Sequence, residues 1–207
     1  MANYHIPLFP DRIYHIFSRA VGNEKLFRER DNHRYFLEQF HKKAGTVADL
    51  LAYCLLPNHF HFLVRIRSEN DVKKVFESVK SGKQFSEENC PDFIMERFSN
   101  WLNGYTKAFN IRYKRKGALF IDYLRRVEIG KDDQLLNTLF YIHKNPVHHG
   151  LVKKIDHWEW SSFREILNEH DRFVSGKEAI DWFGGKDQFE AFHRKPVYLK
   201  TDEEMDL

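Results

Sequence analysis

The pair of strand-forming runs around residues 57–58 constrains the fold more than any other feature of this 207-residue chain. The segment 49–67 reads DLLAYCLLPNHFHFLVRIR, and a single Pro-Asn pair divides it into two runs of apolar and aromatic residues. Apolar runs separated by residues that favour turns predict two strands joined by a turn or a bulge. We therefore expect a sheet in which these two strands are neighbours.

The second of these runs carries two histidines, His59 and His61, one residue apart. In a strand, residues two apart point to the same face, so both imidazoles share one face while Phe60 and Phe62 project into the core on the other. Two adjacent imidazoles can ligate one divalent cation, or they can be two hydrogen-bonded histidines on an open sheet face. The chain has no Cys/His pair at zinc-finger spacing, no His-Glu-x-x-His motif and no glycine-rich phosphate loop, so the residues alone leave both interpretations open.

The remaining pattern completes an α+β fold. With the two strands above, it predicts the rough order strand, helix, two strands, helical region, strand, helix, in which the helical region contains two helices. The expected ranges are strand 12–20, helix 29–45, helices 70–80 and 90–117, strand 118–129, and a helix that Asp132 could cap and Pro146 ends. This order is typical of a ferredoxin-like (split βαβ) antiparallel sheet with helices packed on one face. A C-terminal helical extension follows, packed on the same domain.

Composition indicates an ordinary globular protein of the cytosol. Hydrophobic residues make up 42% of the chain and charged residues 30%, and no apolar run approaches the roughly 18 residues that a membrane helix needs. The first residues lack the pattern of a signal peptide, and two cysteines form no disulfide framework. We expect a cytoplasmic protein with reduced thiols and no membrane partner.

Basic residues concentrate between residues 105 and 130, where seven of them stand against two acidic residues. This stretch suits a track for a nucleic-acid backbone, since cations neutralise phosphates and the aromatic side chains among them can stack on bases. The alternative is a solvated basic helix end that complements the helix dipole. The candidate DNA-binding residues are Lys107, Arg112, Lys114, Arg115, Lys116, Arg125 and Arg126.

Several stretches resemble the HUH single-tyrosine transposases, especially their REP-associated branch. LPNHFHFLV resembles the family's histidine signature. The other matches, in the family's order, are YHIFSRAVGNEKLF, RYKRKGALF, FYIHKNPVHHGLV and WEWSSF. They cover residues 12–165, so the resemblance implies a catalytic domain over 1–165, with 166–207 as the extension. The chain departs from the family pattern at GALFIDYLRR, so contacts to bases or backbone there are not carried over.

The resemblance places the family's catalytic tyrosine at Tyr141 and an amide metal ligand four residues later, at Asn145. At about 100° per residue these two share one side of a helix, away from the apolar stripe that includes Leu139 and Ile142. His143 falls near the apolar side and is expected to pack or cap. Asn145 precedes Pro146, which biases it away from helical dihedral angles and leaves the direction of its side chain open.

The implied activity is cleavage and transfer of single-stranded DNA, with Tyr141 as nucleophile and a covalent 5′-phosphotyrosine intermediate. His59, His61 and Asn145 are the expected metal ligands, and two imidazoles with an amide oxygen suit Mg²⁺ or Mn²⁺ better than structural zinc. The resemblance also implies a hairpin beside the cleavage site, and both a monomer and a homodimer remain open.

Three alternatives remain. The same fold can serve as a non-catalytic binding module for structured single-stranded DNA or RNA. A metal-dependent phosphodiesterase that uses water would not need Tyr141. Tyr123 is a competing nucleophile, although it falls in an expected strand and lacks a helical amide partner. His148 and His149 are expected in a loop.

Overall fold

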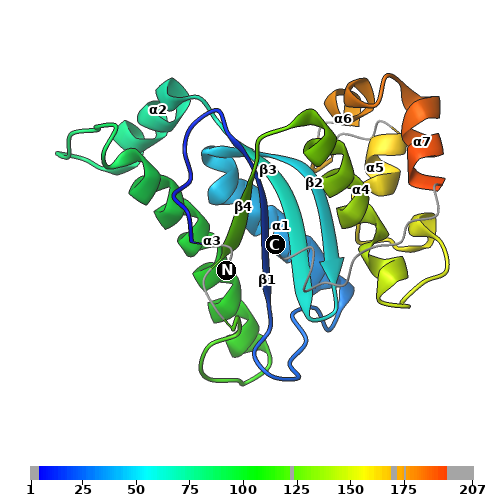
Figure 1. Ribbon diagram of the computed structural model, residues 1–207. Helices are drawn as coiled ribbons and strands as arrows, with labels where there is room; N and C mark the ends of the chain where they lie inside the picture. The colour runs from blue at the N-terminus through cyan, green and yellow to red at the C-terminus, as the bar shows by residue number, and fades with distance from the viewer. Residues whose placement is uncertain (1–4, 122–123, 169–171, 175, 195–207) are drawn as a thin grey trace.

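The fold is a four-stranded antiparallel sheet with helices on both sides (Figure 1). The structure, a computed structural model, describes residues 5–121, 124–168, 172–174 and 176–194. The strands stand in the order β2-β3-β1-β4, and each pair of neighbours is antiparallel. They are β1 (Ile13–Arg19), β2 (Ala48–Leu56), β3 (His59–Ile66) and β4 (Arg125–Ile129). This order along the sheet and along the chain is that of the ferredoxin-like fold, which confirms the expected class.

The helices follow the expected sequence of elements. Before β4 they are α1 (Arg30–Lys42), the short 3₁₀ helix η1 (Ala44–Thr46), α2 (Glu69–Val79) and α3 (Cys90–Arg112). After β4 come α4 (Asp132–His148), the 3₁₀ helix η2 (Ile155–His157), α5 (Phe163–Leu167), α6 (Gly176–Trp182) and α7 (Lys186–Arg194). Among the described residues, no helix has the length and apolarity that a bilayer crossing requires.

One face of the sheet, here called the phenylalanine face, holds the main core. Phe60 and Phe62 of β3 are fully buried there, as the period of two predicts. Trp101 of α3 stacks on Phe62 with the ring centroids 5.3 Å apart, and its indole N–H donates to the carbonyl of Phe36 in α1 at 3.1 Å. Because each fully buried phenylalanine contributes about 1.5–3 kcal/mol, this aromatic layer fixes α1 and α3 on the sheet.

The opposite face, here called the histidine face, is covered by α4. This helix contacts β2 and β3 and lies across the sheet from α1 and α3 (Figure 1). The expectation that helices pack on one face only was wrong, because α4 covers the histidine face. This helix is buried on two sides, whereas the expectation assumed one. Besides its apolar stripe, the side carrying Tyr141 and Asn145 is also buried, because it faces the sheet. The apolar side is covered by α7, whose His193 bonds to His143.

Three local expectations were wrong in detail. Pro146 does not end α4, which continues to His148, with the backbone N–H groups of His149 and Leu151 bonded to the carbonyls of Asn145 and Pro146. Asp132 is the first helical residue rather than the cap. The fourth strand begins only at Arg125.

Packing explains why the proline is tolerated. Pro146 is buried, and only two helical residues follow it, so few backbone hydrogen bonds depend on its missing N–H. The expected helix end at Pro146 was based on local backbone preference alone. Because α4 continues past Pro146, Asn145 stays helical and lies on the same side of α4 as Tyr141.

Candidate active site

His59 begins β3, directly after the turn that joins it to β2. Its ring Nδ1 lies 2.8 Å from the side-chain oxygen of Asn58. Because an amide oxygen only accepts hydrogen bonds, the proton is on Nδ1, and Nε2 is left with a lone pair. This is the tautomer that a metal-ligating histidine needs when Nε2 is its donor.

Asn145 of α4 faces this lone pair. The residue is fully buried, and its side-chain oxygen lies 3.4 Å from Nε2 of His59. The amide nitrogen is also buried and has no hydrogen-bond partner in the described part of the chain. As oriented, two acceptor atoms point at each other, an arrangement that a bound cation would stabilise.

His61 lies next along β3 and is 5% exposed. Its Nδ1 is 3.0 Å from Nε2 of His15, a residue of the neighbouring strand β1. Burial lowers the pKa of His15 to about 3 and the pKa of His61 well below its usual value, so both rings are neutral at physiological pH. His61 is therefore available as a neutral nitrogen ligand.

Tyr141 of α4 lies over these two imidazoles. Its ring centroid is 5.4 Å from that of His61 and 6.0 Å from that of His15, both edge-on. The side chain is only 2% exposed, because α4 presses it against the sheet. The structure thus brings together all four residues expected from the sequence, His59, His61, Tyr141 and Asn145.

The donor set fits a divalent cation. Within the described residues, no group of three His, Cys, Asp or Glu side chains is arranged so that those side chains alone could hold a metal ion. Here the third donor is the side-chain amide of Asn145. Its buried nitrogen has no hydrogen-bond partner among the described residues. His59 and Asn145 already point at one another, and His61 is adjacent, with its ring centroid 5.2 Å from that of His59. The residues present would hold a hard divalent ion of the Mg²⁺ or Mn²⁺ type.

Sequence reasoning missed two residues on this face. His15 interrupts an apolar strand just as His59 and His61 do, and this was the signal that could have identified it. Arg19, at the end of β1, lies directly opposite His59 in the strand register and is exposed. An exposed guanidinium beside the histidines is well placed for a phosphate group.

Of the other expected histidines, His143 lies away from the site and His149 lies beside it. His143 is fully buried and packs on the far side of α4, between Ser162 and His193. The expectation of a loop was wrong for His148, which is the last residue of α4, whereas His149 caps the helix. Both are exposed, and the ring of His149 lies 4.8 Å from that of His59.

The expected DNA-binding residues divide into two groups. The four arginines form the first group, and three of them bond to other parts of the protein as follows. Arg112 pairs with Glu29 at 2.6 Å, Arg115 pairs with Glu24 at 3.0 Å, and Arg126 is 7% exposed, with its guanidinium donating to the carbonyl of Leu124 at 2.8 Å. Burial lowers the pKa of Arg126, which faces the interior and is unsuited to a surface contact. Arg125 is half-buried in β4.

The lysines form the second group. Lys107, Lys114 and Lys116 are exposed, and no described carboxylate pairs with them. They line an open hollow of about 640 Å³ at the C-terminal end of α3, together with Arg115 and with Asn103, Thr106, Asn110 and Ile111. None of the described residues that line it is acidic. Lys114 adopts a left-handed backbone conformation, with φ of 51°, where glycine is usual.

This hollow lies at the same end of the sheet as His59. The backbone N–H of Val21 donates to the carbonyl of Leu119 at 3.0 Å, and that of Ala20 donates to Asn58 at 2.7 Å. The segment after α3 therefore runs beside the end of β1 and the turn before His59.

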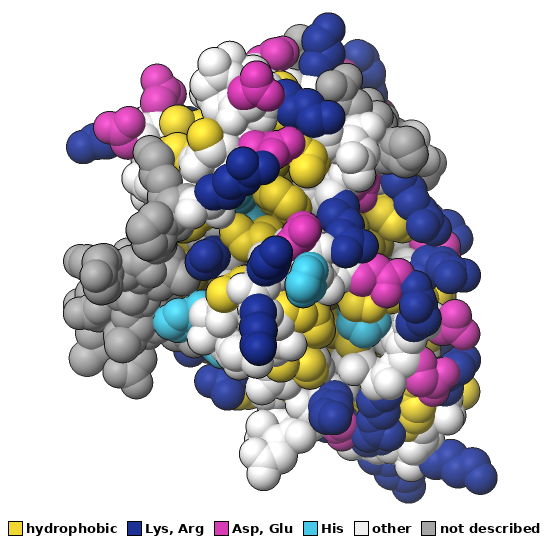
Figure 2. Space-filling view, turned by 90° about the vertical axis from the view of Figure 1, so that its right-hand side faces the viewer, with side chains coloured by type: hydrophobic (Ala, Val, Ile, Leu, Met, Phe, Trp, Pro, Cys, Tyr) yellow, Lys and Arg dark blue, Asp and Glu magenta, His cyan; other side chains and the backbone are white. Residues whose placement is uncertain are grey.

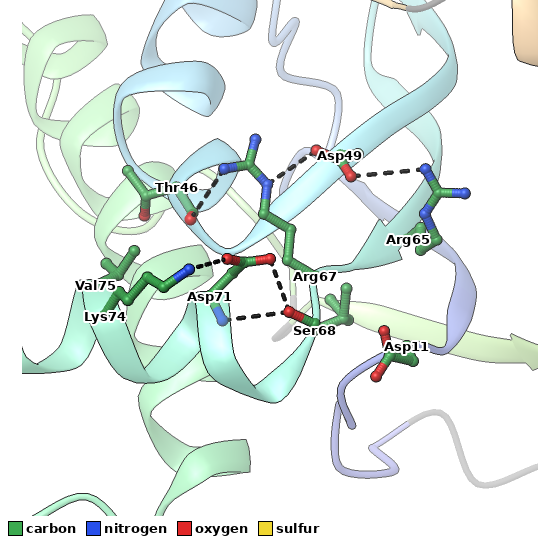
Figure 3. Close-up of a pocket in the computed structure, with 10 residues that line it drawn as sticks. Asp11, Thr46, Asp49, Arg65, Arg67, Ser68, Asp71, Lys74 and Val75 are labelled. Atoms are coloured by element: carbon green, nitrogen blue, oxygen red, sulfur yellow. Dashed lines mark hydrogen bonds and ion pairs between the residues drawn. The ribbon is translucent and has the colours of Figure 1, made fainter.

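Two other parts of the described surface differ from this hollow. A hollow of about 460 Å³ at the start of α2 is lined by ion pairs that already satisfy one another, among them Arg67 with Asp49 and Lys74 with Asp71 (Figure 3). The face that carries α4 to α7 shows basic side chains interspersed with acidic ones (Figure 2). Tyr123, the competing nucleophile, lies outside the described residues.

Comparison with known proteins agrees with this geometry. No family model matches the chain. A protein of Haemophilus influenzae that carries the name REP-associated tyrosine transposase is 29% identical over 128 residues, which are 58% of this chain and 62% of that protein. The chain thus matches less than two thirds of the length of this relative.

A solved structure of a REP-associated tyrosine transposase bound to a REP hairpin superposes with a TM-score of 0.59 at 16% identity. The match covers 82% of this chain and 87% of the other. At this identity the likeness concerns the fold. In sequence and in fold, the chain is similar to the REP-associated tyrosine transposases.

Proposed function

We propose that this protein cleaves and rejoins single-stranded DNA through a covalent bond between Tyr141 and a 5′ phosphate. The observation that carries the proposal is the meeting of Tyr141 with His61, at 5.4 Å between ring centroids, beside the facing nitrogen and oxygen of His59 and Asn145. A nucleophile beside a set of metal donors is what phosphoryl transfer requires.

His59, His61 and Asn145 would hold a Mg²⁺ or Mn²⁺ ion, which would supply charge stabilisation at the scissile phosphate. The phenolate oxygen of Tyr141 attacks phosphorus, the bond from phosphorus to the 3′ oxygen breaks, and the leaving oxygen takes up a proton to become a free 3′ hydroxyl. The phosphotyrosine bond conserves the energy of the phosphodiester, so a second 3′ hydroxyl can reverse the step without ATP.

The lysine-lined hollow and Arg19 supply the proposed binding surface. Lys107, Lys114 and Lys116 are free to neutralise phosphates along a strand that approaches His59. The substrate we propose is single-stranded DNA with a hairpin, since the structural neighbour is bound to one.

The test is incubation with labelled single-stranded DNA that contains a hairpin, with Mn²⁺ or Mg²⁺ present. The wild-type protein is expected to form a protein–DNA adduct that survives denaturant, and Tyr141→Phe is expected to form none. Tyr14→Phe is the matched control, because Tyr14 is also buried but lies on the phenylalanine face. Cleavage that persists in Tyr141→Phe would indicate a water-using phosphodiesterase instead.

One observation favours the second candidate, a binding module without cleavage. Tyr141 is 2% exposed and His61 5% exposed, so a substrate phosphate reaches them only if α4 moves. Under this alternative the wild-type protein binds the hairpin DNA with micromolar or better affinity but yields no adduct with either metal.

A further inference from the structure

We propose that His15 is a positioning residue that holds the proton of His61 on Nδ1 and so keeps Nε2 of His61 bare for a metal ion. The proposal rests on the metal site of the proposed function. It adds a residue outside the expected ligand set, on a different strand, and assigns it one chemical task.

The contact is direct and enclosed. Nε2 of His15 lies 3.0 Å from Nδ1 of His61, and the two rings are stacked with centroids 5.2 Å apart at 22°. Among the described residues, His15 supplies the hydrogen-bond partner of this nitrogen. His15 is 6% exposed, so water does not readily replace it.

The register of the sheet places the two rings together. Phe17 of β1 pairs directly with His61, and His15 stands two residues earlier on the same face, diagonal to His61. Phe17 also stacks on both rings, with centroids 5.0 Å from His15 and 5.7 Å from His61. Phe17 of the sheet and Tyr141 of α4 therefore both pack on the imidazole pair.

Two neutral imidazoles joined by one hydrogen bond share a single proton between the facing nitrogens. If Nδ1 of His61 donates, its Nε2 carries a lone pair and can bind a metal. If Nε2 of His15 donates instead, His61 carries its proton on Nε2 and cannot. The contact therefore decides whether His61 can be a ligand through Nε2.

His59 shows which arrangement the site uses. Its Nδ1 donates to the oxygen of Asn58 at 2.8 Å, and its Nε2 faces Asn145. In the proposed arrangement both histidines of the pair have Nδ1 engaged by a neighbouring side chain, which leaves the Nε2 atoms as the common metal donors. Asn58 does for His59 what we assign to His15 for His61.

The experiment measures the tautomer of His61 in the metal-free protein by nitrogen NMR of the imidazole rings, and the affinity for Mn²⁺ by calorimetry. In His15→Gln the side-chain oxygen stands near the former Nε2 position and still accepts the hydrogen bond. In His15→Phe no acceptor remains. His33→Gln is the control, since His33 is also buried but stacks on Trp160 away from the site.

We expect the wild-type protein and His15→Gln to carry the His61 proton on Nδ1 and to bind Mn²⁺ within a few-fold of each other. His15→Phe should shift the proton to Nε2 and weaken Mn²⁺ binding by about 10- to 100-fold, the usual effect of losing a residue that orients a ligand. The control should change neither measurement.

The proposal is overturned if the wild-type His61 carries its proton on Nε2, or if His15→Phe binds Mn²⁺ as tightly as wild type. Should His15→Phe fail to fold, the wild-type tautomer and the affinity of His15→Gln still decide. These results are separate from the adduct assay. Absence of an adduct with an Nδ1 proton and intact Mn²⁺ binding would refute the cleavage function and leave the role of His15 standing.

Discussion

Acid should loosen the packing of α7 on α4, because two buried histidines link these helices in their neutral form. Nδ1 of His193 lies 2.8 Å from the carbonyl of Phe189 and must donate to it, which leaves Nε2 to accept from Nδ1 of His143 at 2.9 Å. Nε2 of His143 then accepts from the hydroxyl of Ser162 at 2.8 Å. Every ring nitrogen is used, and an added proton has no acceptor.

The loss of stability in acid follows from the pKa of His193, which burial lowers from 6.5 to about 4. Between these two values the unfolded chain binds a proton that the folded protein does not, so the free energy of unfolding falls as pH falls. At about 1.4 kcal/mol per pH unit, the loss from His193 alone is about 3 kcal/mol by pH 4. Above pH 6.5 this contribution is constant.

The perturbation that isolates this residue is His193→Gln, whose side-chain oxygen can still accept from His143 but does not titrate. Urea unfolding is measured at pH 7 and at pH 4.5 for both proteins, with His157→Gln, a change at an exposed position, as control. The variant should be less stable than wild type at pH 7 by about 1 kcal/mol, the usual size of a weakened buried hydrogen bond. At pH 4.5 that difference should shrink or reverse. A difference that stays the same at both pH values would refute the assignment.

Two further predictions concern the lysine-lined hollow. Lys107→Gln should weaken binding of single-stranded DNA and reduce its salt dependence by about one released counterion, whereas Arg112→Gln, which loses a residue paired with Glu29, should have the smaller effect; binding isotherms at several salt concentrations check both. Lys114→Gly should raise the free energy of unfolding by up to about 1 kcal/mol, because Lys114 has a φ of 51°, and at the same time weaken DNA binding. A Lys114→Gly variant with a lower free energy of unfolding than the wild-type protein would contradict this reasoning.

The strands and their faces could be predicted because they depend on residues that are neighbours in the chain. Alternation over residues 59–64 assigns Phe60 and Phe62 to the core and the histidines to the other face, and the Pro-Asn turn makes β2 and β3 neighbours. The strand order, by contrast, depended on recognising the sequence of elements as ferredoxin-like.

The surroundings of α4 could not be predicted in this way. A helical wheel treats one apolar stripe as the buried side, and Tyr141 falls outside that stripe. Its burial arises from the sheet, which covers the side of α4 that carries Tyr141, and this is a contact between segments far apart in the chain. Likewise, the burial of Arg126 depends on the chain before β1, and its charge alone suggested a surface residue.

The two buried sides of α4 tie the candidate site to the C-terminal helices. Tyr141 and His143 are two residues apart and point to opposite sides, one toward His61 and the other toward His193. A helix clamped on both sides cannot rotate to expose Tyr141 without breaking the hydrogen bond between His143 and His193. Access to the tyrosine and docking of α7 are therefore coupled, and conditions or ligands that loosen α7 should also make Tyr141 more accessible. Within the described part of the segment after residue 165, it is His193 that bonds to the side of α4 opposite Tyr141.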